Sequence, residues 1–310
     1  MTRDDTELRP ARPVIRESFR GPMVDGLPAG ASPARWRRRV QRLLVSKGEH
    51  EEAELERLLG GQPSLSRANV VAVISPKPGV GKTSSAFAIG GLLADRLRLR
   101  VIAVDANPDI GTLVALAPSR LRCQRSLADL LTDIEQIETA AQLRSYVSAL
   151  PSGLHLLGAP ADAEVMARLG SDAYGELIAL LCTFYDVVLL DLSTGVAGPV
   201  LQSAIGRADQ VVLVTTPESV ASTAVFTALR HLHQERTIVV ANKFHARRAA
   251  DLRELERRLR ERRLPRPIAI PYDDQLAAML DTATYHLDAL ERRTRIAIKR
   301  LAVAVAEQLV

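Results

Sequence analysis

The residues best suited to chemistry form a short glycine-rich loop in the first third of the chain. Residues 75–84 read Ser-Pro-Lys-Pro-Gly-Val-Gly-Lys-Thr-Ser and directly follow an apolar run at residues 70–74. Glycines let backbone N–H groups turn inward around phosphate oxygens, and a helix starting near Thr83 would add the partial positive charge of its N-terminus. At this spacing Lys82 reaches the terminal phosphates and the Thr83 hydroxyl binds Mg²⁺. The sequence therefore predicts a phosphate-binding loop with these nucleotide contacts: Gly79, Val80, Gly81, Lys82, Thr83 and Ser84.

Lysine usage also points to this loop. Of the 41 basic residues only five are lysine, namely Lys47, Lys77, Lys82, Lys243 and Lys299. Because arginine supplies the general positive charge, the few lysines are candidates for specific roles. Two of them fall within six residues of each other in the loop.

The elements that must position this loop follow from an alternation along residues 69–310. Short β-branched runs are separated by stretches long enough for crossover helices, and several runs are apolar throughout, as in strands buried on both faces of a parallel sheet. The runs are 70–74, 101–104, 154–157, 187–190, 211–214, 238–240 and 268–270. We predict an α/β fold, a doubly wound and mostly parallel sheet of the P-loop NTPase type, with a largely disordered or helical N-terminal extension.

A family resemblance rests on Lys77, which lies five residues before Lys82. With this lysine the loop resembles the deviant Walker A motif of the ParA/MinD family of P-loop ATPases, over about residues 69–310. The chain is similar in style to MinD-like ATPases of actinobacteria, some of them encoded with type VII secretion systems. In that family ATP is sandwiched between two subunits. The resemblance implies ATP and Mg²⁺ as cofactors, an ATP-dependent homodimer, and catalytic roles for Lys77 and Lys82, with Lys77 reaching the phosphates held by the other subunit.

Two further segments, each containing an aspartate, resemble the remaining catalytic motifs of that family. Residues 104–109, Val-Asp-Ala-Asn-Pro-Asp, are similar to its switch I, and residues 185–191, Tyr-Asp-Val-Val-Leu-Leu-Asp, to its Walker B strand, which leads into switch II at 192–195. The resemblance implies that Asp105 is catalytic, positions the attacking water and belongs to the metal shell. It also implies that Asp191 and Thr83 hold the Mg²⁺.

Residues 239–245, Val-Val-Ala-Asn-Lys-Phe-His, bear on the choice of base. They superficially resemble the Asn-Lys-x-Asp guanine reader, but His245 replaces the carboxylate that would accept two guanine N–H donors. A carboxylate offers two acceptors and a neutral imidazole one, which favours ATP over GTP. By resemblance Asn242 contacts the adenine edge and Pro271 also lies at the nucleotide. The plain interpretation of Lys243 is a solvated side chain at a strand end.

Two positions depart from the family pattern. Pro78 replaces the first glycine after the signature lysine, which removes one N–H and fixes φ near −65°. A pyrrolidine ring there would hinder the close approach of two loops in a sandwich dimer. Asn107 stands where many relatives have a second aspartate, which fits slow hydrolysis.

The predicted function is that of an ATPase that hydrolyses ATP to ADP and phosphate and acts as a nucleotide-dependent switch. The process served would be partitioning, cell division or secretion. Two alternatives stay open: a degenerate nucleotide-binding scaffold with little hydrolysis because of Pro78, and an ATP-dependent ligase on the same fold, which would make no use of Lys77.

The first 68 residues of the chain differ from the rest in composition. Residues 1–33 are rich in proline and without periodicity, which predicts a disordered tail. Residues 34–68 are expected to form a helical extension and linker, with a basic amphipathic helix at 34–45 and an acidic helix at 49–59. We expect a protein partner to bind residues 1–68. The basic helix, which carries Trp36, suits peripheral contact with an anionic membrane, or packing on the acidic helix or the ATPase domain.

Residues 246–266 hold nine arginines and four acidic residues, which equals the +5 net charge of the whole chain. A leucine stripe at Leu252, Leu255 and Leu259 predicts a helix. Its arginines suit either a solvated, salt-bridged face or non-specific DNA binding.

Length and composition argue against several other classes of protein. With 310 residues, no apolar run of about 18 and an acidic N-terminus, the chain shows neither a membrane span nor a secretory signal, and the expected compartment is the cytoplasm. Two cysteines make no disulfide framework, and no residue spacing supports a metal other than Mg²⁺.

Overall fold

The computed structural model describes residues 48–61, 63–107, 112–194 and 199–309, which belong to one compact unit running from Gly48 to Val310. The predicted tail at 1–33 and basic helix at 34–45 lie outside the described residues. The predicted domain boundary at residue 69 falls inside the compact unit, because the helix at residues 48–59 is part of it.

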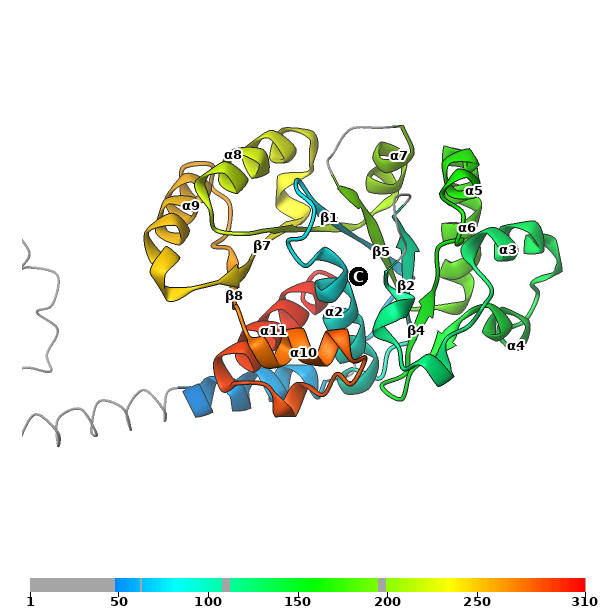
Figure 1. Ribbon diagram of the computed structural model, residues 1–310, viewed down its shortest axis with the longest axis horizontal. Helices are drawn as coiled ribbons and strands as arrows, with labels where there is room; N and C mark the ends of the chain where they lie inside the picture. The colour runs from blue at the N-terminus through cyan, green and yellow to red at the C-terminus, as the bar shows by residue number, and fades with distance from the viewer. Residues whose placement is uncertain (1–47, 62, 108–111, 195–198, 310) are drawn as a thin grey trace, which may run out of the picture. The chain divides into compact units, whose positions relative to one another are not determined.

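The core of this unit is an eight-stranded sheet in the order β3-β4-β2-β5-β1-β6-β7-β8 (Figure 1). All pairs are parallel except that of β3 with β4. The strands are β1 (Asn69–Ser75), β2 (Val101–Ala106), β3 (Ser148–Ala149), β4 (Leu154–Leu157), β5 (Val187–Thr194), β6 (Gln210–Thr215), β7 (Thr237–Phe244) and β8 (Ile268–Pro271). All seven predicted strands are confirmed. The eighth, β3, has two residues, too few for any periodic signal.

Helices lie between the strands along the chain. They are α2 (Lys82–Arg96), α3 (Leu127–Thr132), α4 (Ala140–Leu143), α5 (Ala163–Arg168), α6 (Ser171–Phe184), α7 (Pro199–Arg207), α8 (Ser219–Ala228) and α9 (Ala249–Glu261). Two more, α10 (Asp274–Asp281) and α11 (Arg292–Ala306), follow the last strand. The predicted helix at 246–266 is shorter than expected. It starts with a 3-10 turn at Ala246–Arg248 and ends before Arg263, whose φ of 59° is left-handed.

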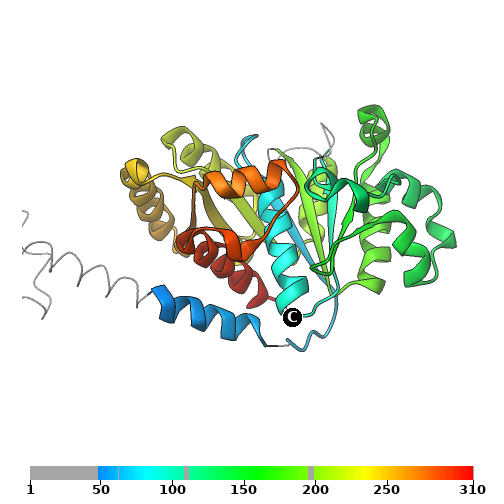
Figure 2. The same ribbon diagram turned by 60° about the horizontal axis from the view of Figure 1, so that its bottom comes forward.

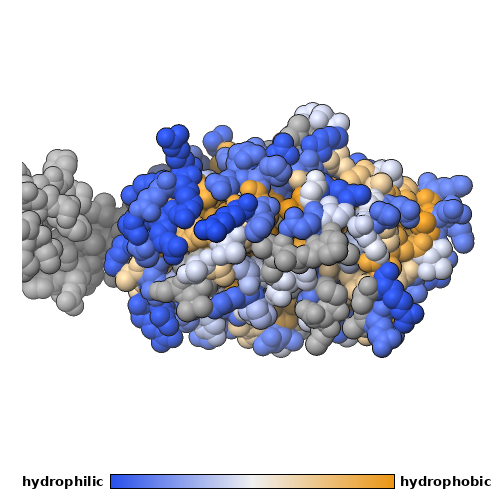
Figure 3. Space-filling model, turned by 90° about the horizontal axis from the view of Figure 1, so that it is seen from above, coloured by the Kyte–Doolittle hydropathy of each residue, from blue (hydrophilic) through white to orange (hydrophobic). Residues whose placement is uncertain are grey.

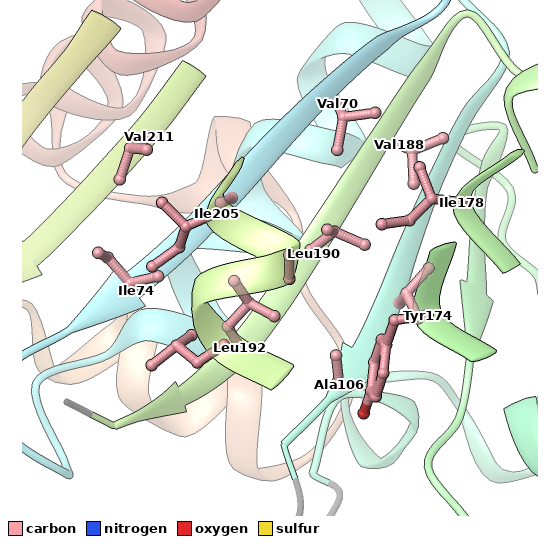
Figure 4. Packing of buried hydrophobic residues seen from close by; sticks show 14 of the residues in the cluster. Val70, Ile74, Ala106, Tyr174, Ile178, Val188, Leu190, Leu192, Ile205 and Val211 are labelled. Atoms are coloured by element: carbon pink, nitrogen blue, oxygen red, sulfur yellow. The ribbon is translucent and has the colours of Figure 1, made fainter. Parts of the chain in front are cut away.

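Alternate strand residues supply two separate cores, one on each face of the sheet. On one face Ile74, Leu190 and Val211 meet Tyr174 and Ile178 of α6 and Ile205 of α7 (Figure 4). On the other face, residues of the intervening register, such as Val73 and Leu189, pack against α2 and α11. This period of two, with both sets buried, explains why the strands are apolar throughout.

The helix at residues 48–59 lies along α11 on this second face (Figure 2). Leu55 and Leu59 are buried in the same core as α11, and the acidic residues face the basic residues of α11. The acidic helix predicted at 49–59 therefore exists, and its charge is matched within the compact unit.

Candidate functional site

The glycine-rich loop joins the end of β1 to the first residue of α2, as a phosphate-binding loop requires. Gly79 and Gly81 have φ values of 71° and 89°, in the left-handed region where glycine is favoured. A Cβ on Gly81 would lie 2.2 Å from the amide nitrogen of Asn242, so a side chain here would strain the left-handed backbone and displace that amide. Pro78 is exposed at the tip of the loop. The backbone is thus shaped to present N–H groups at the N-terminus of α2.

Lys82 forms a buried ion pair with Asp191 of β5. The ammonium lies 2.5 Å from Asp191 Oδ1, and the side chains are only 7% and 1% exposed. The neighbouring strand β5 carries Asp191 opposite Val73 of β1, which places the carboxylate beside the loop. The pair places a buried positive charge beside the loop.

Asp105 lies opposite Asp191 on the adjacent strand β2 and is also buried. Its Oδ2 accepts a hydrogen bond of 2.8 Å from the backbone N–H of Leu113, whereas its Oδ1 has a weaker one of 3.4 Å from the N–H of Asn107. Burial raises the pKa of Asp105 to about 6, and the charge of Asp191 adds to this effect, while the two N–H groups oppose it. The Asp105 carboxyl group therefore titrates close to neutral pH.

Asp191 is suited to a cation and its water shell. Burial raises its pKa, against the attraction of Lys82 and the nearby Thr83 hydroxyl. Its Oδ2 is buried and has no hydrogen-bond partner among the described residues. An orphaned carboxylate oxygen next to a hydroxyl fits Mg²⁺, which takes one or two protein oxygens and keeps several waters. The described residues hold no cluster of three or more acidic, histidine or cysteine side chains, so other metal sites find no support there.

Asn242 and Pro271 lie on the other side of the loop, at the carboxyl ends of β7 and β8. Asn242 is 9% exposed, and its amide donates a hydrogen bond of 2.8 Å to the carbonyl of Val80. Pro271 is the last residue of β8, where it pairs with Phe244. Beyond them the rings of His245 and Tyr272 stack, with centroids 4.7 Å apart, so the His245 ring is occupied by an aromatic contact.

Parallel strand ends thus bring the predicted residues to a single edge of the sheet. From one side to the other, the strand order places Asp105, Asp191, the loop, Asn242 and Pro271. Lys77 is half-buried in the loop. It lies close enough to Glu218 that its charge, together with a Thr216 hydrogen bond and Arg248, lowers the pKa of Glu218 despite partial burial.

Sequence reasoning missed two contacts at this edge. One is the backbone N–H of Leu113 on Asp105, which depends on how the chain returns after switch I and has no sequence signal. The other is Lys243, whose ammonium donates a 2.7 Å hydrogen bond to the carbonyl of Gly79. The scarcity of lysine was a signal for this residue. Switch residues 108–111 and 195 lie outside the described residues.

The arginine-rich segment lies at the end of the sheet that carries α8 and α9, where the surface is mostly hydrophilic (left in Figures 1 and 3). Arg257 pairs with Glu254 and Glu261, and the guanidinium groups of Arg258 and Arg262 lie over the Phe226 ring at 4.2 and 4.4 Å. Part of the basic face is therefore matched within the chain. Other arginines of this segment are exposed: Arg253, Arg260, Arg263 and Arg266.

Comparison with known proteins identifies the family. The AAA domain family (AAA_31) matches residues 68–241, more than half of the chain. With the deviant loop, the two buried aspartates and the parallel sheet, the chain belongs to the ParA/MinD family of P-loop ATPases.

Sequence similarity to individual proteins supports this family assignment. The chain is 24% identical to the ESX-1 secretion-associated protein EspI of Mycobacterium tuberculosis, over 88% of this chain and 41% of EspI, so it corresponds to less than half of that protein. It is 26% identical to the antiactivator FleN of Pseudomonas aeruginosa, over 78% of this chain and 88% of FleN.

Solved structures share the fold. A ParA family ATPase from Chlorobium tepidum superposes with a TM-score of 0.64 at 20% identity, covering 75% of this chain and 98% of that one. The septum site-determining protein MinD of Pyrococcus horikoshii, solved with Mg-ADP, gives 0.59 at 20% identity, with coverage of 76% and 94%. None of the helices in the described ranges is long and apolar enough to cross a membrane.

Proposed function

We propose that this protein is a cytoplasmic Mg-ATP-binding ATPase that works as a nucleotide-dependent switch. The observation that carries the proposal is the convergence of the phosphate loop, the Lys82–Asp191 pair and Asp105 at one edge of the sheet. Family membership and a relative solved with Mg-ADP support the choice of ligand. Gly79, Val80, Gly81, Lys82, Thr83 and Ser84 would bind the phosphates.

Charge stabilisation is the first part of the mechanism. Lys82 and the N–H groups at the start of α2 would hold the β- and γ-phosphate oxygens and stabilise the charge that develops on them. Bound Mg²⁺, held through Thr83 and Asp191, would neutralise the phosphates. Because Lys82 is paired with Asp191, an incoming phosphate would share the ammonium with that carboxylate.

Asp105 would act on the attacking water. Its Oδ2 is fixed by Leu113, which leaves the weakly bonded Oδ1 to accept the proton. A pKa of about 6 keeps most of the group ionised at neutral pH and close to the operating pH, which is the range in which general bases are efficient.

Adenine is the base we propose. The Asn242 amide has a second N–H and a carbonyl oxygen in addition to the hydrogen that it gives to Val80, so it can still meet the adenine edge. His245, stacked on Tyr272, does not replace the carboxylate that guanine would need. Pro271 would border the base from β8.

The output would be a change in partner binding. We propose an ATP-dependent homodimer in which Lys77 reaches the nucleotide of the other subunit, a protein partner at residues 1–68, and secretion, division or partitioning as the process served. The likeness to EspI favours secretion. We further propose that residues 34–45 contact a membrane and that residues 246–266 bind DNA. The exposed arginines of α9 and its flanks support DNA binding, and the affinity for DNA should fall steeply as the salt concentration rises.

Phosphate release from Mg-ATP by the purified protein tests the proposal. We expect slow turnover that Asp105→Ala abolishes, while nucleotide binding persists. Binding without turnover in the wild type would instead indicate the scaffold that Pro78 suggests. Turnover unchanged by Lys77→Ala would favour the ligase alternative. Light scattering in the nucleotide-free, ADP and ATP states then tests the dimer, with Pro78→Gly as the matched variant.

A further inference from the structure

The carboxyl end of β7 carries a bulge at Asn242 and Lys243. β7 pairs with β8 at Ala241 and again at Phe244, and over this interval β7 advances one residue more than β8. Lys243 has a φ of 54°, in the left-handed region that residues with a side chain seldom adopt. Bulges re-aim side chains, and such strain persists only where surrounding contacts maintain it.

The bulge directs two successive side chains to the same loop. In a regular strand neighbouring side chains point to opposite faces. Here the Asn242 amide donates to the carbonyl of Val80 at 2.8 Å, and the Lys243 ammonium donates to the carbonyl of Gly79 at 2.7 Å. The end of β7 therefore holds two consecutive carbonyl groups of the phosphate loop.

We propose that Lys243 is a positioning residue for the phosphate-binding loop. In a planar trans peptide the carbonyl of one residue and the N–H of the next point in opposite directions. Fixing the Gly79 carbonyl toward Lys243 therefore turns the Val80 N–H away from β7, and the Asn242 contact does the same for the N–H of Gly81. The two contacts would thus hold the loop with its N–H groups facing the phosphates.

The proline at the loop tip makes this support more important. Pro78 has no N–H, so the loop offers one donor fewer than a glycine there would allow. The remaining donors must be well placed for tight binding. Because Lys243 is exposed and makes a single hydrogen bond to the loop, its loss should weaken Mg-ATP binding by about three- to tenfold rather than abolish it.

The inference rests on the proposed function for its ligand, so its test includes a measurement without nucleotide. Lys243→Met keeps the side-chain stem and removes the donor, Lys243→Arg keeps a donor, and Lys243→Gly relaxes the left-handed backbone. Arg98→Met is the control, because Arg98 is also exposed, basic and left-handed, with a φ of 56°, and lies beyond the opposite end of α2.

Backbone ¹⁵N relaxation of Gly79, Val80 and Gly81 in the nucleotide-free protein reports the order of the loop, and calorimetry with Mg-ATP reports affinity. We expect Lys243→Met to lower both the loop order and the affinity, and Lys243→Arg to restore part of each. Lys243→Gly should lower the affinity while leaving the melting temperature unchanged or higher, an outcome that a purely structural role would not produce.

Loop order and affinity in Lys243→Met equal to those in Arg98→Met would overturn the inference. If the wild type binds no nucleotide but Lys243→Met still loosens the loop, the proposed function fails and the positioning role stands.

Discussion

Two buried lysines of this chain differ in the carboxylates that surround them. Lys82, at the phosphate loop, meets one carboxylate, Asp191, which has an orphaned oxygen among the described residues. Lys299, on α11, is 2% exposed and meets two, Glu52 at 2.8 Å and Glu56 at 2.6 Å. Arg295 bonds Glu52 as well.

The carboxylates respond in opposite directions. The hydrogen bonds from Arg295 and Lys299 lower the pKa of Glu52 to about 2 in spite of its burial. Burial raises the pKa values of Asp191 and Asp105, the latter to about 6. A carboxylate with a lowered pKa contributes to folding stability at neutral pH. A buried carboxylate with a raised pKa is a candidate for a ligand-binding or catalytic site. The Lys299 ammonium and its carboxylates are thus paired within the fold, whereas the Lys82–Asp191 pair keeps one buried oxygen without a partner among the described residues.

The largest expected effect is on nucleotide binding. Lys82→Ala should lower Mg-ATP affinity at least about 100-fold, because it removes the only buried cation that the described residues place beside the loop. Lys299→Met should leave affinity within about twofold while lowering stability. Calorimetry and chemical denaturation on both variants measure this, and equal loss of binding in the two would erase the distinction.

Hydrolysis should depend on Asp105 almost as strongly. Asp105→Asn is expected to slow phosphate release by about 100-fold, the lower range for loss of a general base, with affinity changed less than about threefold. In the wild type the rate should rise with pH through about 6, as the Asp105 carboxyl group loses its proton. A wild-type rate independent of pH between 5 and 7 would argue against Asp105 as the base.

Substitution of Glu52, which pairs with Lys299 and Arg295, should change the stability of the protein and not its nucleotide binding. Glu52→Gln removes a carboxylate whose pKa is lowered from 4.5 to about 2, so the free energy of unfolding at pH 7 should fall by about 3 kcal/mol. This contribution is present above the unfolded pKa near 4.5 and is lost as the pH falls toward 2. Glu54→Gln, an exposed position on the same helix, is the control and should change little. Urea denaturation measures both, and similar losses would contradict a special role for Glu52.

Asp105 should show the opposite pH dependence. Its folded pKa is raised, so its contribution to stability is complete below about 4 and is lost as the pH rises through about 6, by about 3 kcal/mol. Asp105→Asn should remove this loss, so the variant should be more stable than the wild type at pH 7 but not at pH 4. Denaturation curves at the two pH values provide the measurement. A variant less stable at both would show that the hydrogen bond from Leu113 outweighs the burial of charge.

Much of this site could be read from sequence because its parts are local. The loop and the first turn of α2 are contiguous, and Asp105 and Asp191 each end an apolar run. In a parallel sheet such ends meet at one edge. The acidic helix at 49–59 was also predicted from its own periodicity, but its place on α11 was not, because charge pairs between segments about 240 residues apart leave no local pattern.

The sequence by itself determined which runs form buried strands, where the phosphate loop lies, and that the lysines are scarce enough to be candidates for specific roles. Only the tertiary structure decided what three of those lysines contact. Lys82 and Lys299 are both buried, yet one faces an unsatisfied carboxylate and the other a satisfied pair, and Lys243 reaches the loop through a bulge. The physical reason is that burial and partner geometry, which set the cost of each charge, are fixed by elements that are distant in the chain.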